Sequence, residues 1–74
     1  MLQVGKFYVF NGQSLILATG PDYGIIVSNG LRLDDIADWE ITSKPMTARR
    51  AATRFPQYDF MWLAHLRDTA EKEG

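Results

Sequence analysis

The sequence predicts an α+β fold, in which a small antiparallel β-meander of four to five short strands is followed by C-terminal helices. Two features predict it. Asn11-Gly12, Asn29-Gly30 and the segment 20–24 divide the first 42 residues into short apolar stretches, and Asn-Gly pairs favour the tight turns of β-hairpins. After Pro45 the apolar residues recur at helical spacing instead, which indicates a change of secondary structure.

The strands are expected between these turns, at about residues 3–10, 13–19, 24–28 and 31–34. A short helical turn is expected over 34–37, and a short fifth strand over 39–42. Several short strands joined by tight turns are typical of a small barrel or a strongly curved sheet. The meander is therefore expected to span residues 1–42, with closure into a barrel as an open alternative.

The first hairpin is apolar on both of its predicted faces. If Asn11-Gly12 forms a two-residue turn, Tyr8 pairs with Leu15 and Phe7 pairs with Ile16. One face then holds Val4, Tyr8, Phe10, Leu15 and Leu17, and the other holds Phe7, Val9, Ile16 and Ala18. A sheet with one face in water would alternate apolar and polar residues. A C-terminal helix can cover one face, and a barrel interior, a homodimer contact or a partner surface would cover the other.

Residues 45–72 are expected to be helical, with a break or kink at Pro56, because proline lacks the N–H that a helix interior needs. Ala48, Ala51, Ala52 and Phe55 recur at one helical face. Two residues are alternative N-caps for this helix. Ser43 would be the cap if Pro45 lies in the first turn, and Thr47 is the other candidate. In the second helix, from about residue 57, one stripe holds Tyr58, Met61, Trp62, His65, Leu66 and Ala70, widened by Phe60, Leu63 and Ala64. Trp62 is predicted to be mostly buried and to anchor this helix against the sheet.

Composition limits the kinds of protein that this chain can be. With 74 residues it is expected to form a single domain, residues 1–74. It has no cysteine, which excludes disulfide scaffolds and thiolate metal sites. The apolar run 60–64 is too short to span a membrane, and the N-terminus lacks the layout of a signal peptide. We therefore expect a cytoplasmic protein with no membrane partner.

Charge is unevenly distributed along the chain, although the net charge is only −1. Residues 33–40 hold four acids and no base, and residues 41–58 hold Lys44 and three arginines and no acid. The candidate partner-binding residues are Arg49, Arg50, Arg54, Asp34, Asp35 and Asp38. Arginine forks suit phosphate and carboxylate groups, and blocks of opposite charge orient a charged partner.

No catalytic, metal-binding or cofactor-binding signature is found. His65 is the only histidine, and it shares a helix face with Asp68. No nucleophile stands near the pair in sequence, and two ligands are too few for zinc. The acidic stretch 34–40 lacks the alternate ligands and the glycine of a calcium loop. We therefore expect no catalytic residue, no metal and no cofactor, and a chain that is not an enzyme.

The sequence favours a small protein-interaction module, with a protein partner or a second copy of the chain. Two-sided apolar strands and adjacent blocks of opposite charge motivate this hypothesis. In size and style the chain is similar to the small accessory proteins of phages and mobile elements, which bind and modulate host proteins; this is an analogy, not a motif. The alternative is a nucleic-acid-binding regulator that uses Arg49, Arg50, Arg54 and Lys44, although the net charge argues against it.

Overall fold

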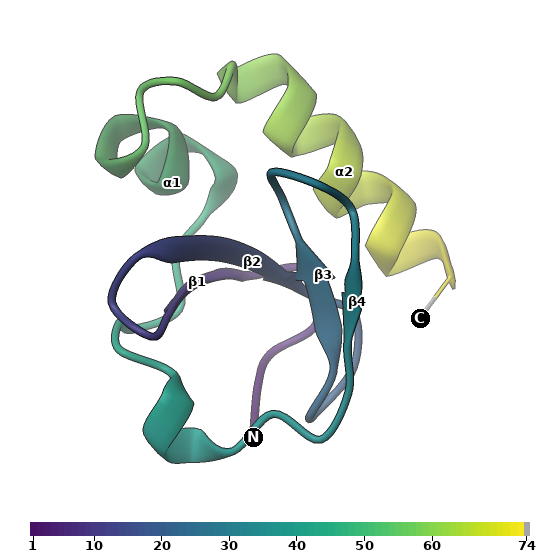
Figure 1. Cartoon of the computed structure of the whole chain (residues 1–74). Coiled ribbons are helices and arrows are strands. Elements are labelled where there is room, and N and C mark those ends of the chain that lie inside the picture. Colours follow the sequence, from purple (N-terminus) through teal and green to yellow (C-terminus); the bar gives the residue numbers. More distant parts are fainter. Residues whose placement is uncertain (74) are drawn as a thin grey trace.

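The computed structural model describes residues 1–73 and contains a four-stranded antiparallel sheet followed by helices (Figure 1). The elements are β1 (Phe7–Phe10), β2 (Ser14–Ala18), β3 (Gly24–Ile26), β4 (Arg32–Leu33), the short 3₁₀ helix η1 (Asp38–Glu40), α1 (Ala48–Arg54) and α2 (Phe60–Glu73). The strands lie in the sheet in chain order, β1-β2-β3-β4. The predicted α+β fold with a β-meander is therefore confirmed. Within residues 1–73 the sheet is open and does not close into a barrel.

The turn between β1 and β2 forms where the sequence predicts it, but the strands pair one residue out of the expected register. Asn11 and Gly12 have φ angles of 51° and 75°, and the Gln13 N–H donates to the Phe10 carbonyl at 3.2 Å. Pairing resumes only at Ser14, which is opposite Phe10. The predicted pairing of Tyr8 with Leu15 is therefore wrong, because Gln13 adds a third residue to the loop.

This shift decides which residues share a face of the sheet. Tyr8 lies opposite Ile16, and Val9 lies opposite Leu15. Since side chains alternate between faces along a strand, a slip of one residue moves a whole strand's set to the other side. Leu15 and Leu17 therefore join Phe7 and Val9, and not Tyr8 as expected.

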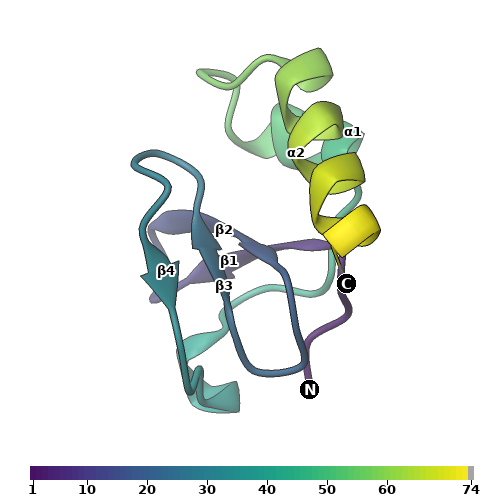
Figure 2. The same ribbon diagram turned by 90° about the vertical axis from the view of Figure 1, so that its right-hand side faces the viewer.

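Both faces of the first hairpin are covered by the chain itself. On one face, Phe7, Val9, Leu15 and Leu17 form a cluster with residues of the helices, namely Ala48, Ala51, Leu63 and Ala70, and with Val27 and Met46. On the other face, Tyr8, Ile16 and Ala18 cluster with Leu2 and Ile36. Figures 1 and 2 show the helices on one side of the sheet, and the N-terminal segment and η1 on the other. The second apolar face is thus covered by short segments of the same chain.

The fifth strand predicted over 39–42 is not formed. Residues 38–40 are η1, in which the Glu40 side chain accepts a hydrogen bond from the Ala37 N–H at 2.9 Å. The strand-like pairing of this part of the chain with β1 is limited to isolated bridges, from Ile41 to Phe10 and from Met46 to Phe7. The helical turn expected over 34–37 is also absent: Asp35 has a φ of 53°, which a right-handed turn does not accept.

The outer edge of β1 is tied to this segment by side-chain hydroxyl groups. The Val9 N–H donates to Ser43 Oγ at 2.9 Å, and the Gly12 N–H donates to Thr42 Oγ1 at 2.9 Å. Phe7 and Met46 exchange backbone hydrogen bonds of 2.9 and 2.8 Å. Residues 41–46 therefore run along β1 in a fixed position, although they do not form a regular strand.

α1 confirms the apolar periodicity in the sequence. Thr47 is its N-cap, with the Arg50 N–H donating to Thr47 Oγ1 at 3.2 Å. Ala48 and Ala51 are fully buried. The helix ends at Arg54 because the next residue, Phe55, precedes Pro56, and the residue before a proline disfavours the helical conformation. Of the two expected effects of Pro56, a break and a kink, the structure has the break: α1 and α2 are separate helices.

α2 packs on the sheet through a different residue from the one expected. Trp62 is 42% exposed, so the prediction that it is buried is wrong. Leu63 is fully buried, and Ala70, one heptad later, is also buried. Trp62 lies instead beside Tyr58, with ring centroids 5.9 Å apart, outside the core. No helix within residues 1–73 has both the length and the apolar character needed to cross a membrane.

Candidate binding cleft

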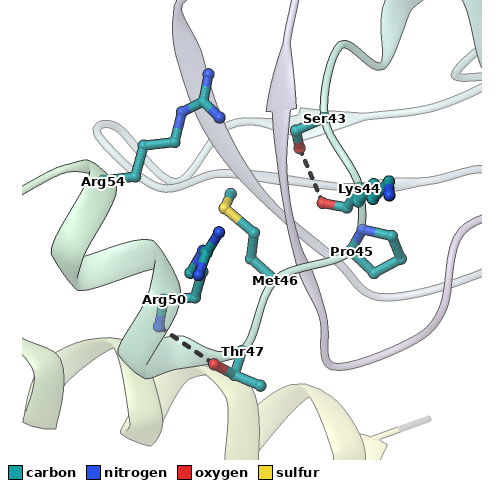
Figure 3. A pocket seen from close by; sticks show the side chains of 7 residues that line it. All are labelled: Ser43, Lys44, Pro45, Met46, Thr47, Arg50 and Arg54. Carbon is teal, nitrogen blue, oxygen red and sulfur yellow. Dashed lines mark hydrogen bonds between the residues drawn. The ribbon is translucent and has the colours of Figure 1, made fainter.

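A cleft of about 510 Å³ lies between α1 and the segment that precedes it. It is lined by residues 43–47, Arg50 and Arg54 (Figure 3). Figure 3 shows Arg50 and Arg54 on the helix side of the opening, Lys44 and Pro45 on the other side, and Met46 between them. We call this feature the cationic cleft, because its charged lining residues are Lys44, Arg50 and Arg54.

Both walls of the cationic cleft are fixed to the core of the protein. Arg50 and Arg54 are one helical turn apart on α1, whose opposite face is held in the core by Ala48 and Ala51. The other wall is held by the backbone hydrogen bonds between Met46 and Phe7. The cationic groups therefore project from backbone that is already ordered, which lowers the entropy lost when a ligand binds.

Met46 forms the apolar floor of the cleft, and Ser43 and Thr47 contribute hydroxyl groups to its lining. The two hydroxyl groups differ in whether a hydrogen is left to donate to a ligand. Met46 is 6% exposed. Ser43 Oγ accepts from the Val9 N–H and donates to the Lys44 carbonyl at 3.0 Å, so its hydrogen is already used. Thr47 Oγ1 accepts from the Arg50 N–H. A hydroxyl that accepts one bond retains its own hydrogen to donate, so Thr47 can add a neutral donor to the cations.

None of the three cations has a carboxylate partner among the described residues. The ion pairs there join Met1 to Asp38, Arg32 to Asp34, and Arg67 to Asp68. Lys44, Arg50 and Arg54 form none of these pairs, and all three are exposed. The cleft therefore carries three positive charges that the protein does not neutralise locally.

Arg49 and the acidic residues proposed from the sequence lie elsewhere. The Arg49 guanidinium is 4.4 Å from the centre of the Phe60 ring, a cation–π contact that directs it towards α2. Asp34 forms a 2.8 Å ion pair with Arg32, and its hydrogen bond raises the pKa of that arginine. Asp38 is 3.5 Å from the N-terminal amine, and Asp35 is exposed.

The acidic and basic blocks that adjoin in the sequence are therefore separated in space. η1 and α1 lie at opposite ends of the molecule in Figure 1. Of the partner-binding candidates, Arg50 and Arg54 meet in the cleft, together with Lys44 from the nucleic-acid alternative. The sequence did not single out the other lining residues as site residues, namely Ser43, Pro45, Met46 and Thr47. The basic block in the sequence includes Lys44, but nothing in the pattern places it across from the helix.

The structure also locates the residues that the sequence analysis weighed for metal binding and acid–base chemistry. The described residues contain no group of three or more His, Cys, Asp and Glu side chains that could hold a metal ion. His65 is exposed, and the carboxylate of Asp68 is paired with Arg67 at 3.0 Å. Among the described residues, the cationic cleft is therefore the strongest candidate for a binding site.

In comparisons with known proteins, no protein-family model, no curated protein and no solved structure matches the chain.

Proposed function

We propose that this chain is a small non-enzymatic protein-interaction module that binds an anionic segment of a partner protein in the cationic cleft. The observation that carries the proposal is the gathering of Lys44, Arg50 and Arg54 around one opening without a carboxylate partner among the described residues. That the chain is an accessory protein of a phage or mobile element stays a prediction, which is based on its size and style.

Like charges held close together repel one another, and a bound anion removes that repulsion. Surface ion pairs are worth only about 0–1 kcal/mol each, so a single exposed arginine would give little affinity. Arg50 and Arg54, however, present planar donor forks that bind an oxyanion with two parallel hydrogen bonds, and Lys44 adds a third charge from the opposite wall. An anionic group would therefore be held from two sides.

The shape of the site favours a short segment of a partner. A volume of about 510 Å³ is within the range of pockets that enclose small ligands, about 300–1,000 Å³. Met46 lies between the cations, and Pro45 lies beside Lys44 on one wall, so an apolar residue that flanks the anionic group can pack against them. An acidic side chain with an apolar neighbour has this character.

Binding to nucleic acid is the alternative function. A phosphate backbone needs a track of cations, and Arg49 is diverted to Phe60 and does not continue the cleft. The net charge of −1 also opposes non-specific attraction to a polyanion. A gel-shift titration at low salt decides this alternative, because phosphate-based affinity falls steeply as salt is added.

The proposed function is tested by affinity capture from bacterial lysate with matched variants. The wild-type chain, the Arg50→Gln/Arg54→Gln variant and the Arg49→Gln variant are immobilised at equal density, and captured proteins are quantified by mass spectrometry. We expect at least one protein to be retained by wild type and by Arg49→Gln, and lost from the double variant. Equal capture by all three chains would refute the role of the cleft.

A further inference from the structure

We infer that the cationic cleft is a phosphoryl-binding site, which takes the phosphate monoester of a phosphorylated side chain in the partner segment. This inference rests on the proposed function and names its ligand. It is carried by three features of the cleft: its number of charges, the arrangement of its donors and the absence of acid from its lining.

The number of charges matches a phosphate monoester better than a carboxylate. A phosphorylated side chain carries a charge of about −1.5 to −2 at neutral pH, whereas a carboxylate carries −1. A single carboxylate between Lys44, Arg50 and Arg54 would leave two cations facing each other without compensation. A dianion neutralises most of the positive charge in one binding event.

The donors come from the two walls of the cleft and from the N-cap of α1. Arg50 and Arg54 extend from α1, and Lys44 extends from the segment opposite. Thr47, at the start of α1, retains a hydroxyl hydrogen that it can donate. A phosphate monoester offers three strong acceptor oxygens pointing in different directions, whereas the two oxygens of a carboxylate lie in one plane. Donors that approach from separate directions therefore favour the tetrahedral group.

Within residues 1–72, whose side chains the structure describes, the lining contains no carboxylate and no imidazole. Nothing acidic is positioned to repel the second negative charge of a phosphate. Between about pH 5 and pH 7 the group that changes charge is therefore the ligand itself, because the second pKa of a phosphate monoester is about 6. Affinity for a phosphorylated ligand should then fall on acidification through this range.

The experiment is a titration of the full chain followed by ¹⁵N–¹H correlation spectra. The probes are short peptides, identical except that the central residue is phosphoserine, glutamate or serine, and a short oligothymidylate serves as the nucleic-acid arm. We expect the phosphoserine peptide to bind at least about fivefold more tightly than the glutamate peptide. The shifted amides should lie in residues 43–54, and affinity should decrease about threefold or more from pH 7 to about pH 5.

Two single variants on the same helix provide the matched control. Arg50→Gln should weaken binding of the phosphoserine peptide about fivefold or more. Arg49→Gln should leave it unchanged, because Arg49 contacts Phe60 outside the cleft. Thermal melts of both variants show whether they are folded.

Three outcomes would overturn the inference, and they differ in what they leave standing. Equal affinity for the glutamate and phosphoserine peptides removes the phosphoryl ligand but agrees with an anionic partner segment. Tighter binding of the oligothymidylate replaces the inference with the nucleic-acid alternative. No binding of any probe overturns the phosphoryl site, and the capture experiment with the variants then decides separately whether a partner uses the cleft.

Discussion

The two faces of the sheet are buried by different means. One face is covered by α1 and α2, whose buried residues Ala48, Ala51, Leu63 and Ala70 pack on the hairpin. The other is covered by Leu2 and Ile36, which belong to irregular segments. A helix presents a continuous apolar stripe, whereas an irregular segment contributes single side chains. The helical face should therefore carry more of the free energy of unfolding, and the opposite face should be the one that opens first.

The largest expected effect is that of Leu63→Ala. Leu63 is fully buried beneath α2, and its truncation leaves a cavity that costs about 3–4 kcal/mol. In a domain of this size that loss would lower the melting temperature by roughly 12 °C or more. Urea unfolding followed by far-UV circular dichroism measures it. A loss below about 1 kcal/mol would contradict the packing of α2 on the sheet.

Ile36→Ala tests the opposite face and should cost less, about 2 kcal/mol. Ile36 is 8% exposed and is held by an irregular segment, which can relax around the missing methyl groups. The same urea experiment measures the change. A cost equal to that of Leu63→Ala would break the distinction between the two faces.

Thr47→Ala removes the cap of α1 and should destabilise the chain by about 1 kcal/mol. Its hydroxyl accepts from the Arg50 N–H, which would lose its protein partner. Thr47→Ser serves as the control, since it keeps the acceptor. Equal melting temperatures for the alanine variant and wild type would show that the cap does not stabilise the helical face.

The smallest expected effect is that of Trp62→Ala, with a cost of about 0.5–1 kcal/mol. Trp62 is 42% exposed and contacts Tyr58 rather than the core. Trp62 and Leu63 are adjacent on α2, so the pair of alanine variants compares its two sides directly. A cost for Trp62→Ala as large as that for Leu63→Ala would restore the anchor role that the sequence indicates.

The sequence predicts the elements of this fold better than their mutual positions. Asn-Gly specifies the turn at residues 11–12 because both positions need positive φ. It does not specify whether Gln13 joins the loop or pairs with Phe10, and that choice sets the register of the hairpin. Likewise, the helical period of residues 57–72 allows several apolar stripes. The packing of α2 on the sheet selects one of them, in which Leu63 is buried and Trp62 is not.

The candidate site was predictable only in part for a similar reason. Spacing places Arg50 and Arg54 on one helix face, and the structure agrees. Adjacency in the sequence also grouped them with Arg49 and with the acids, which the fold separates. Lys44 and Met46 enter the cleft because residues 41–46 are tied to β1 by backbone hydrogen bonds and by hydroxyl groups. The periodic patterns of a sequence do not indicate a tertiary contact of this kind.

The hydroxyl groups along β1 have a consequence for self-association. Unpaired N–H groups at a sheet edge are a template for strands of other molecules, and they promote aggregation. Ser43 Oγ accepts a hydrogen bond from the Val9 N–H, and Thr42 Oγ1 accepts one from the Gly12 N–H in the adjoining turn. These backbone donors at the edge are therefore not available to another strand. The other edge, β4, is two residues long and is followed by Asp34 and Asp35. At both margins of the sheet, strands from neighbouring molecules therefore find little to pair with.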